Sequence, residues 1–196
     1  MNKGIINLIV ALCLALGSTA AASGDRQGID LEELARAPTL DVWEADVGGL
    51  QLRYHLVDLR SLPVLGYAQA DFREGTCNIF IDAWLNRGLP RVHKEVVLHE
   101  VGHCVDLFEL GFDHNGFYRE GCMYGEYYCD PAEGYAETWR YAYLATCGTD
   151  LHSIGYRQAD GSPCDLPDPR SVTPQMAGTW YRVGRMRELE WFIGLR

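Results

Sequence analysis

The spacing of apolar and polar residues along this 196-residue chain changes near Pro90. Before that point, residues 50–57 (LQLRYHLV) place an apolar side chain at every second position, which is the period of a half-buried strand. Two shorter runs, VLGYAQA and TCNIFID, lie on either side of the turn-like sequence DFREG. The first part of the chain therefore predicts a small sheet.

Beyond Pro90 the apolar residues recur at helical spacing as far as Gly111, which predicts a helix. Proline suits the first turn of this helix, because the first turn does not use the N–H that proline lacks. The next stretch is rich in glycine and aromatic residues and predicts a loop. Residues 131–146 predict a second helix and residues 173–193 a last one. Strands followed by helices indicate an α+β fold.

Composition and charge narrow the class of protein. With 47% hydrophobic and 22% charged residues, the chain is typical of one globular domain. Its formal net charge of -10 opposes a wide contact with nucleic-acid phosphates or anionic lipid, which both need a basic face. We therefore expect no nucleic-acid partner, and we expect a monomer.

The first 22 residues read as an export signal. Lys3 supplies the positive start, residues 5–17 form a short apolar run, and small residues offer cleavage sites after Ala20 or Ala22. The run is too short to span a membrane comfortably, and no second apolar segment follows it. These features predict a secreted or periplasmic protein with no membrane insertion after signal removal.

The remainder of the chain divides into a leader and a main domain. Residues 23–49 have no assigned role and are read as a pro-segment, a linker or part of the fold, and the main domain is expected over residues 50–196. Six cysteines follow the signal, and an even number in an exported chain favours disulfides. Neighbour pairing would join Cys77 with Cys104, Cys122 with Cys129, and Cys147 with Cys164.

The helix after Pro90 contains the sequence HEVGH. His99 and His103 are four residues apart, so both imidazoles lie on one helix face and can bind the same ion. Glu100 is close enough to reach a metal-bound water without being a ligand itself, as in the HExxH arrangement. Neighbouring valines indicate a largely buried helix, in which each unsatisfied polar group costs on the order of a few kcal/mol. A bound cation satisfies all three side chains, and we expect Zn²⁺.

A catalytic zinc needs a third protein ligand and one open position for water. Asp106, Glu109 and His114 lie close in sequence, but a second helix fits better. There EGYAETW puts Glu133 and Glu137 four residues apart on one face. One of these carboxylates can bind the ion while the other accepts the free ring N–H of a ligating histidine. Periodicity alone does not decide which one is the ligand.

The sequence HEVGHCVD, followed about thirty residues later by EGYAETW, resembles the gluzincin metallopeptidases. Within that group it is similar to the catalytic domain of anthrax lethal factor and to the Pro-Pro endopeptidases. The resemblance implies a zincin-like fold in which His99, His103 and Glu133 bind zinc. It also implies that Glu100 is the general base and that Glu137 does not bind the ion but contacts a ligating residue.

The same family places a tyrosine before the third ligand, where its hydroxyl donates a hydrogen bond to the oxyanion of the reaction. The usual position, seven residues before the glutamate, here holds Glu126. Tyr124, Tyr127 and Tyr128 lie nearby, and we expect Tyr124 because a tyrosine-glycine pair at that place resembles the family sequence. The similarity covers about residues 96–140, so it implies no substrate preference.

Together these features predict a secreted zinc metalloendopeptidase that hydrolyses a peptide or protein substrate, with Glu100 as the base. TCNIFID is interpreted either as an edge strand that binds an extended peptide or as an ordinary edge or interior strand of the sheet. Asp106 is expected to orient His103 or to hold the following loop, with an ordinary salt bridge as the alternative.

A non-catalytic exported binding protein with a structural zinc site is the alternative function. Such a site is closed by four protein ligands, often including cysteine, and Cys104 lies next to His103 in sequence. Consecutive helix residues diverge by about 100°, however, which points the Cys104 side chain away from His99.

Overall fold

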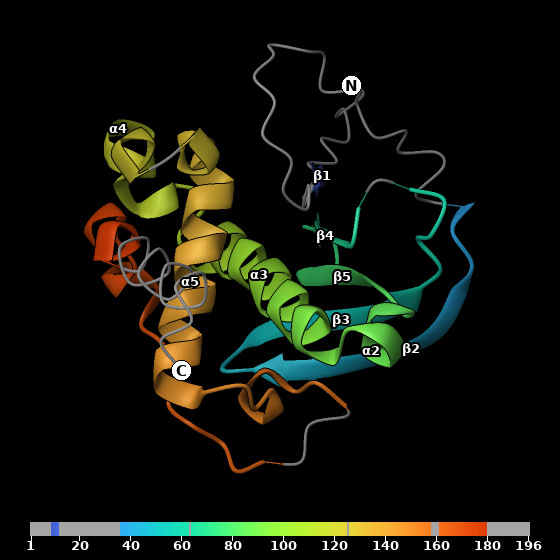
Figure 1. The fold of residues 1–196 in the computed structure, drawn as a ribbon. Coiled ribbons are helices and arrows are strands. Elements are labelled where there is room, and N and C mark those ends of the chain that lie inside the picture. The colour runs from blue at the N-terminus through green and yellow to red at the C-terminus, as the bar shows by residue number, and fades with distance from the viewer. Residues whose placement is uncertain (1–8, 12–35, 63, 125, 158–160, 180–196) are drawn as a thin grey trace, which may run out of the picture.

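The computed structural model describes residues 9–11, 36–62, 64–124, 126–157 and 161–179. These residues form a mixed α+β fold, in agreement with the predicted class. A sheet lies on one side, a long helix crosses it, and a second long helix packs on the first, so that α3 lies between the sheet and α5 (Figure 1).

The sheet contains five strands in the order β1-β4-β5-β3-β2. The pair β3 and β5 is parallel, and the other neighbouring pairs are antiparallel. The strands are β1 (Ile9–Ala11), β2 (Thr39–Val47), β3 (Leu50–Val57), β4 (Gly66–Asp71) and β5 (Thr76–Asp82).

Two long helices, two short ones and several 3-10 turns follow or connect the strands. The long helices are α3 (Pro90–Glu109) and α5 (Pro131–Cys147), and the short ones are α2 (Leu85–Gly88) and α4 (Phe117–Glu120). The 3-10 turns are η1 (His114–Gly116), η2 (Gly121–Tyr124), η3 (Glu126–Cys129), η4 (His152–Ile154) and η5 (Pro169–Ser171). The stretch between α3 and α5, expected to be a loop, is therefore made largely of short helical turns.

Strand β3 covers the residues that the alternating pattern predicted, and β5 covers the shorter predicted strand TCNIFID. TCNIFID, however, is an interior strand, because β5 pairs with β4 on one side and with β3 on the other. Of the alternatives left open for this segment, the interior strand is confirmed and the edge strand is wrong.

The sheet begins before residue 50. Strand β2 lies within the leader of unassigned role and pairs along its length with β3. Only Trp43 is buried in this strand, so its apolar alternation is too weak to be recognised in the sequence. Strand β1 falls inside the predicted signal segment and pairs with β4, whereas the rest of that segment lies outside the described residues.

Local sequence explains where the two long helices begin and end. Both start with proline in the first turn, at Pro90 and Pro131. Asp130 caps α5 by accepting hydrogen bonds from the backbone N–H groups of the next turn, and Gly148 follows its end with a φ of 65°. The predicted last helix is observed over residues 174–179, and its remainder lies outside the described residues.

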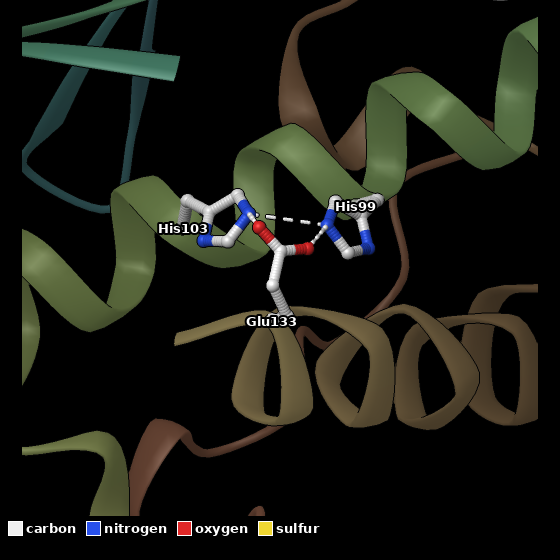
Figure 2. Close-up of side chains that lie close together, drawn as sticks. All are labelled: His99, His103 and Glu133. Carbon is white, nitrogen blue, oxygen red and sulfur yellow. Dashed lines mark hydrogen bonds and ion pairs between the residues drawn. The ribbon is translucent and has the colours of Figure 1, made fainter. Parts of the chain in front are cut away.

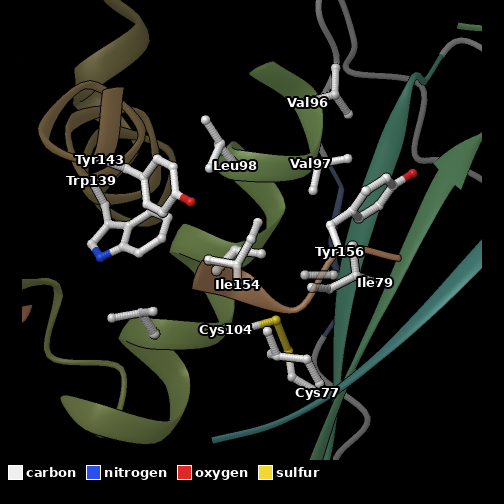
Figure 3. Packing of buried hydrophobic residues seen from close by; sticks show 14 of the residues in the cluster. Cys77, Ile79, Val96, Val97, Leu98, Cys104, Trp139, Tyr143, Ile154 and Tyr156 are labelled. Carbon is white, nitrogen blue, oxygen red and sulfur yellow. A yellow bond between two sulfur atoms is a disulfide. The ribbon is translucent and has the colours of Figure 1, made fainter. Parts of the chain in front are cut away.

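The buried face of α3 packs on the sheet, and a disulfide fastens the two together. Cys104 of α3 is bonded to Cys77 of β5 in the middle of the apolar core (Figure 3). A second disulfide joins Cys147, at the end of α5, to Cys164. These are two of the three expected pairs. Cys129 is also disulfide-bonded, whereas the side chain of Cys122 lies outside the description.

Helices α3 and α5 approach each other closely at one point. A Cβ atom at Gly102 would lie 2.8 Å from both the Cα and the carbonyl oxygen of Ala136. The absence of a side chain at residue 102 thus allows the two backbones to touch. In the part of the chain that the structure describes, no helix is long and apolar enough to cross a membrane.

Candidate metal centre

The central turns of α3 bring two buried imidazoles together. His99 and His103 lie on one face of the helix, and their Nε2 atoms are 3.1 Å apart. Both side chains are almost completely buried. Figure 2 shows the two rings pointing from α3 toward the carboxylate of Glu133 on α5.

Glu133 completes the group from the first turn of α5. One of its carboxylate oxygens lies 3.1 Å from Nε2 of His99, and the other lies 3.6 Å from Nε2 of His103. The backbone N–H of Glu133 is bound by the capping side chain of Asp130, which fixes the turn from which the carboxylate projects. His99, His103 and Glu133 thus form a group that could hold a metal ion.

The separations within this group fit a tetrahedral ion. Zinc binds nitrogen and oxygen at about 2.0–2.1 Å, which places neighbouring ligand atoms roughly 3.3 Å apart. The chemistry of the donors agrees. Nδ1 of His99 lies 3.2 Å from a carboxylate oxygen of Glu137, so a neutral ring that donates from Nδ1 keeps a lone pair on Nε2. That lone pair faces an oxygen of Glu133, and two acceptors at this distance need a proton or a cation between them.

Glu137 therefore contacts the far ring nitrogen of His99, whereas Glu133 faces Nε2 of both imidazoles. Arg140 holds Glu137 in place through hydrogen bonds from Nε, at 3.0 Å, and from a terminal nitrogen. Arg140 also donates a hydrogen bond to Glu95 of α3 at 2.8 Å, so its guanidinium links α5 to α3. Arg140 was not among the predicted residues, although its spacing of three residues from Glu137 on a helix is typical of an ion pair.

Charge is distributed unevenly over these groups. Burial would lower the pKa of His99, but its hydrogen bonds to Glu133 and Glu137 outweigh this effect and raise it to about 10. Burial also favours the neutral form of Glu137, yet the hydrogen bond from His99 and the charge of Arg140 lower its pKa to about 2. Burial lowers the pKa of His103 to about 3, which outweighs the opposing effect of the charge of Glu133. The ring of His103 is therefore neutral and keeps a lone pair available, as a metal ligand requires.

Glu100 is buried beside this group with no partner. Neither of its carboxylate oxygens forms a hydrogen bond with the residues that the structure describes. Burial raises its pKa to about 8, the charge of His99 opposes this rise, and the carboxylate of Glu133 adds to it. An unsatisfied buried carboxylate costs free energy, and this one lies next to a group that could hold a metal ion.

Asp106 holds the loop after α3. Its carboxylate accepts the backbone N–H of His114 at 3.0 Å and contacts Nδ1 of the same residue at 2.5 Å. Phe112, His114 and Asn115 all have positive φ angles, which are uncommon for residues with side chains. Of the roles considered for Asp106, the structure therefore supports fixing this loop. Nδ1 of His103 has no hydrogen-bond partner in the described chain.

The three candidate tyrosines occupy different places. Tyr124 ends η2 and is partly buried, and its ring packs so closely on Gly178 that a Cβ there would lie 2.3 Å from it. Tyr128 is buried, and its ring lies close to Gly134, directly after Glu133. The side chain of Tyr127 lies outside the description.

The group offers three candidate ligands among the described residues, and no fourth histidine, cysteine or acidic residue of those ranges joins it. Cys104, the neighbour that a structural site could have used, is bonded to Cys77 instead. Comparisons of the chain with protein-family models, with curated proteins and with solved structures find no match. The likeness to the gluzincins is therefore carried by the motif residues alone.

Proposed function

We propose that this protein is an exported zinc metallopeptidase of the gluzincin type with a zincin-like fold. The observation that carries the proposal is the combination of a three-ligand group with an adjacent, unpartnered carboxylate. Three protein ligands leave a position for water, as catalytic zinc sites do. The same observation counts against a structural zinc site, which four protein ligands would close.

Zinc bound by His99, His103 and Glu133 would lower the pKa of a coordinated water and polarise the carbonyl of a peptide. Glu100 would accept a proton from the attacking water and then donate it to the leaving amine. Tyr124 would donate a hydrogen bond to the oxyanion that forms on the substrate.

Strand β4 would bind the substrate. It lies beside α3, since a Cβ at Gly66 would come within 2.8 Å of the side chain of Val96. Its outer edge carries the short strand Ile9–Ala11, which belongs to the segment that export would remove. An extended peptide could then pair with the free edge through its main chain.

The test is peptide hydrolysis by the purified exported protein, measured on a peptide library with and without a metal chelator. We expect one zinc per chain and activity that the chelator abolishes. Glu100→Gln should keep its zinc and lose about 10²–10⁴-fold in rate. Glu74→Gln makes the same chemical change at an exposed turn and should behave like the unmodified protein. Full activity in Glu100→Gln, or a metal-free active protein, would refute the mechanism.

A further inference from the structure

The guanidinium of Arg140 on α5 is held from several sides. Its Nε and one terminal nitrogen donate to the two carboxylate oxygens of Glu137, and the other terminal nitrogen donates to Glu95 at 2.8 Å. Its central carbon also lies 4.3 Å from the centre of the Tyr141 ring. The side chain is 10% exposed. A planar guanidinium with paired hydrogen bonds fixes the orientation of the carboxylate that it binds.

These contacts restrict what Glu137 can bind. A carboxylate offers about four lone-pair positions on its two oxygens. Arg140 uses one position on each oxygen, and Nδ1 of His99 faces a third at 3.2 Å. The positive charge of Arg140 also repels a second cation at the same carboxylate. Glu137 is therefore poorly suited to bind a metal ion and well suited to accept the Nδ1–H of His99.

The two glutamates of α5 differ in their distance from this positive charge. Glu137 precedes Arg140 by three positions, about 4.5 Å along the helix axis, whereas Glu133 precedes it by seven, about 10 Å. The carboxylate of Glu133 lies 3.1 Å from Nε2 of His99 and 3.6 Å from Nε2 of His103. A cation between the imidazoles and α5 therefore meets the glutamate that is farther from the guanidinium.

We propose that Arg140 is a positioning residue of the metal site. It commits Glu137 to the Nδ1–H of His99 and so leaves Glu133 as the carboxylate that binds the ion. Arg140 contacts neither the ion nor a substrate, and its effect passes through Glu137 to the orientation of the His99 ring. The inference rests on the metal binding that belongs to the proposed function, but it does not depend on peptide hydrolysis.

Zinc affinity of the intact exported protein, measured by competition with a chelator, tests the proposal. Arg140→Met removes the hydrogen bonds to Glu137 and should weaken zinc binding by about 10–100-fold, the usual effect of losing an outer partner of a metal ligand. Arg140→Lys keeps the charge without the paired hydrogen bonds, so its affinity should lie between those of Arg140→Met and the unmodified protein. The lysine variant carries the test if Arg140→Met does not fold.

A double variant distinguishes positioning from a general structural role. If Arg140 acts through Glu137, combining Arg140→Met with Glu137→Gln should weaken zinc binding no more than the stronger of the two single changes. Independent effects would instead multiply to a loss of about 10²–10⁴-fold. The multiplied loss would overturn the proposal.

Two further variants serve as controls for the contact with Glu137. Glu95→Ala removes the link between α5 and α3 but leaves Arg140 paired with Glu137, so it should bind zinc as the unmodified protein does. Arg157→Met makes the same chemical change at an exposed ion pair with Asp41 and should also leave zinc affinity unchanged.

The outcomes separate this inference from the metal site itself. The inference alone is overturned if the unmodified protein binds zinc and Arg140→Met binds it equally well, or if Glu95→Ala weakens binding as much as Arg140→Met. An unmodified protein that binds no zinc would overturn the proposed function and this inference together.

Discussion

Gly102 of α3 lies directly against the backbone of Ala136 of α5. His103 of the candidate metal group directly follows Gly102, and Glu137, which contacts His99, directly follows Ala136. The contact between the two helices therefore lies next to the residues that carry the imidazoles and carboxylates. Helix spacing and metal-site geometry are therefore coupled through one missing side chain.

Gly102→Ala should weaken the metal site. A Cβ at residue 102 meets backbone atoms that cannot rotate away, so the helices must separate. We expect a loss of about 1–3 kcal/mol in the free energy of unfolding, typical of overpacking, together with weaker zinc binding. Denaturant unfolding and competition with a chelator measure the two effects. Gly88→Ala is the matched control, because a Cβ there meets nothing within 4 Å, and equal zinc affinity in both variants would contradict the coupling.

Substitution of the two glutamates on α5 should separate their roles. Glu133→Ala removes a ligand and should lose bound zinc, whereas Glu137→Gln should keep zinc with an affinity about 10–100-fold lower. Arg140 retains its partner Glu95 in the second variant, which limits the structural damage. Metal content after dialysis is the measurement. A metal-free Glu137→Gln beside a zinc-loaded Glu133→Ala would reverse the assignment.

His93 should make stability depend on pH. Its Nε2 lies 2.6 Å from the hydroxyl oxygen of Tyr156, and burial, followed by the nearby charge of Lys94, lowers its pKa from 6.5 to about 4. His93 therefore binds a proton less readily in the folded chain than in the unfolded chain. The stability that the neutral ring contributes is present above pH 6.5 and is lost as the pH falls toward 4, by up to about 3 kcal/mol.

The measurement is the free energy of urea unfolding at several pH values for the unmodified protein and for His93→Gln. The glutamine cannot titrate, so the difference between the two proteins should change across this range in favour of the variant at low pH. A difference that stays constant from pH 7 to pH 4 would show that His93 is not responsible.

The two described disulfides should differ in their effect on the metal site. Replacing Cys77 and Cys104 by alanine removes a disulfide between residues 27 positions apart. This change should lower the free energy of unfolding by about 3–4 kcal/mol. Because Cys104 directly follows His103 on α3, we also expect weaker zinc binding. Replacing Cys147 and Cys164, which are 17 residues apart, should cost slightly less stability and leave zinc affinity unchanged. Equal zinc affinities in the two double variants would contradict a role for the first disulfide in fixing α3.

Local spacing predicted much of the fold. The alternating pattern of residues 50–57 depends only on the two-residue period of a strand, and β3 covers those residues. The helix from Pro90 was predicted because its apolar residues recur with the period of a helix. The observed α3 ends two residues before Gly111. Strand β2 was not predicted, because it buries only Trp43 and so shows no regular alternation of apolar residues.

For the site, the sequence by itself determined that His99, Glu100 and His103 share a helix, because a spacing of four residues is one helical turn. It also determined that Glu133 and Glu137 share a face of a second helix, but it left their roles open, since they are one turn apart on the same face. Only the tertiary structure decided that Glu133 faces the imidazoles, that Asp106 holds His114, and that β5 is interior. These outcomes depend on how separate segments meet, and no local period in a chain encodes the contact between two distant backbones that Gly102 allows.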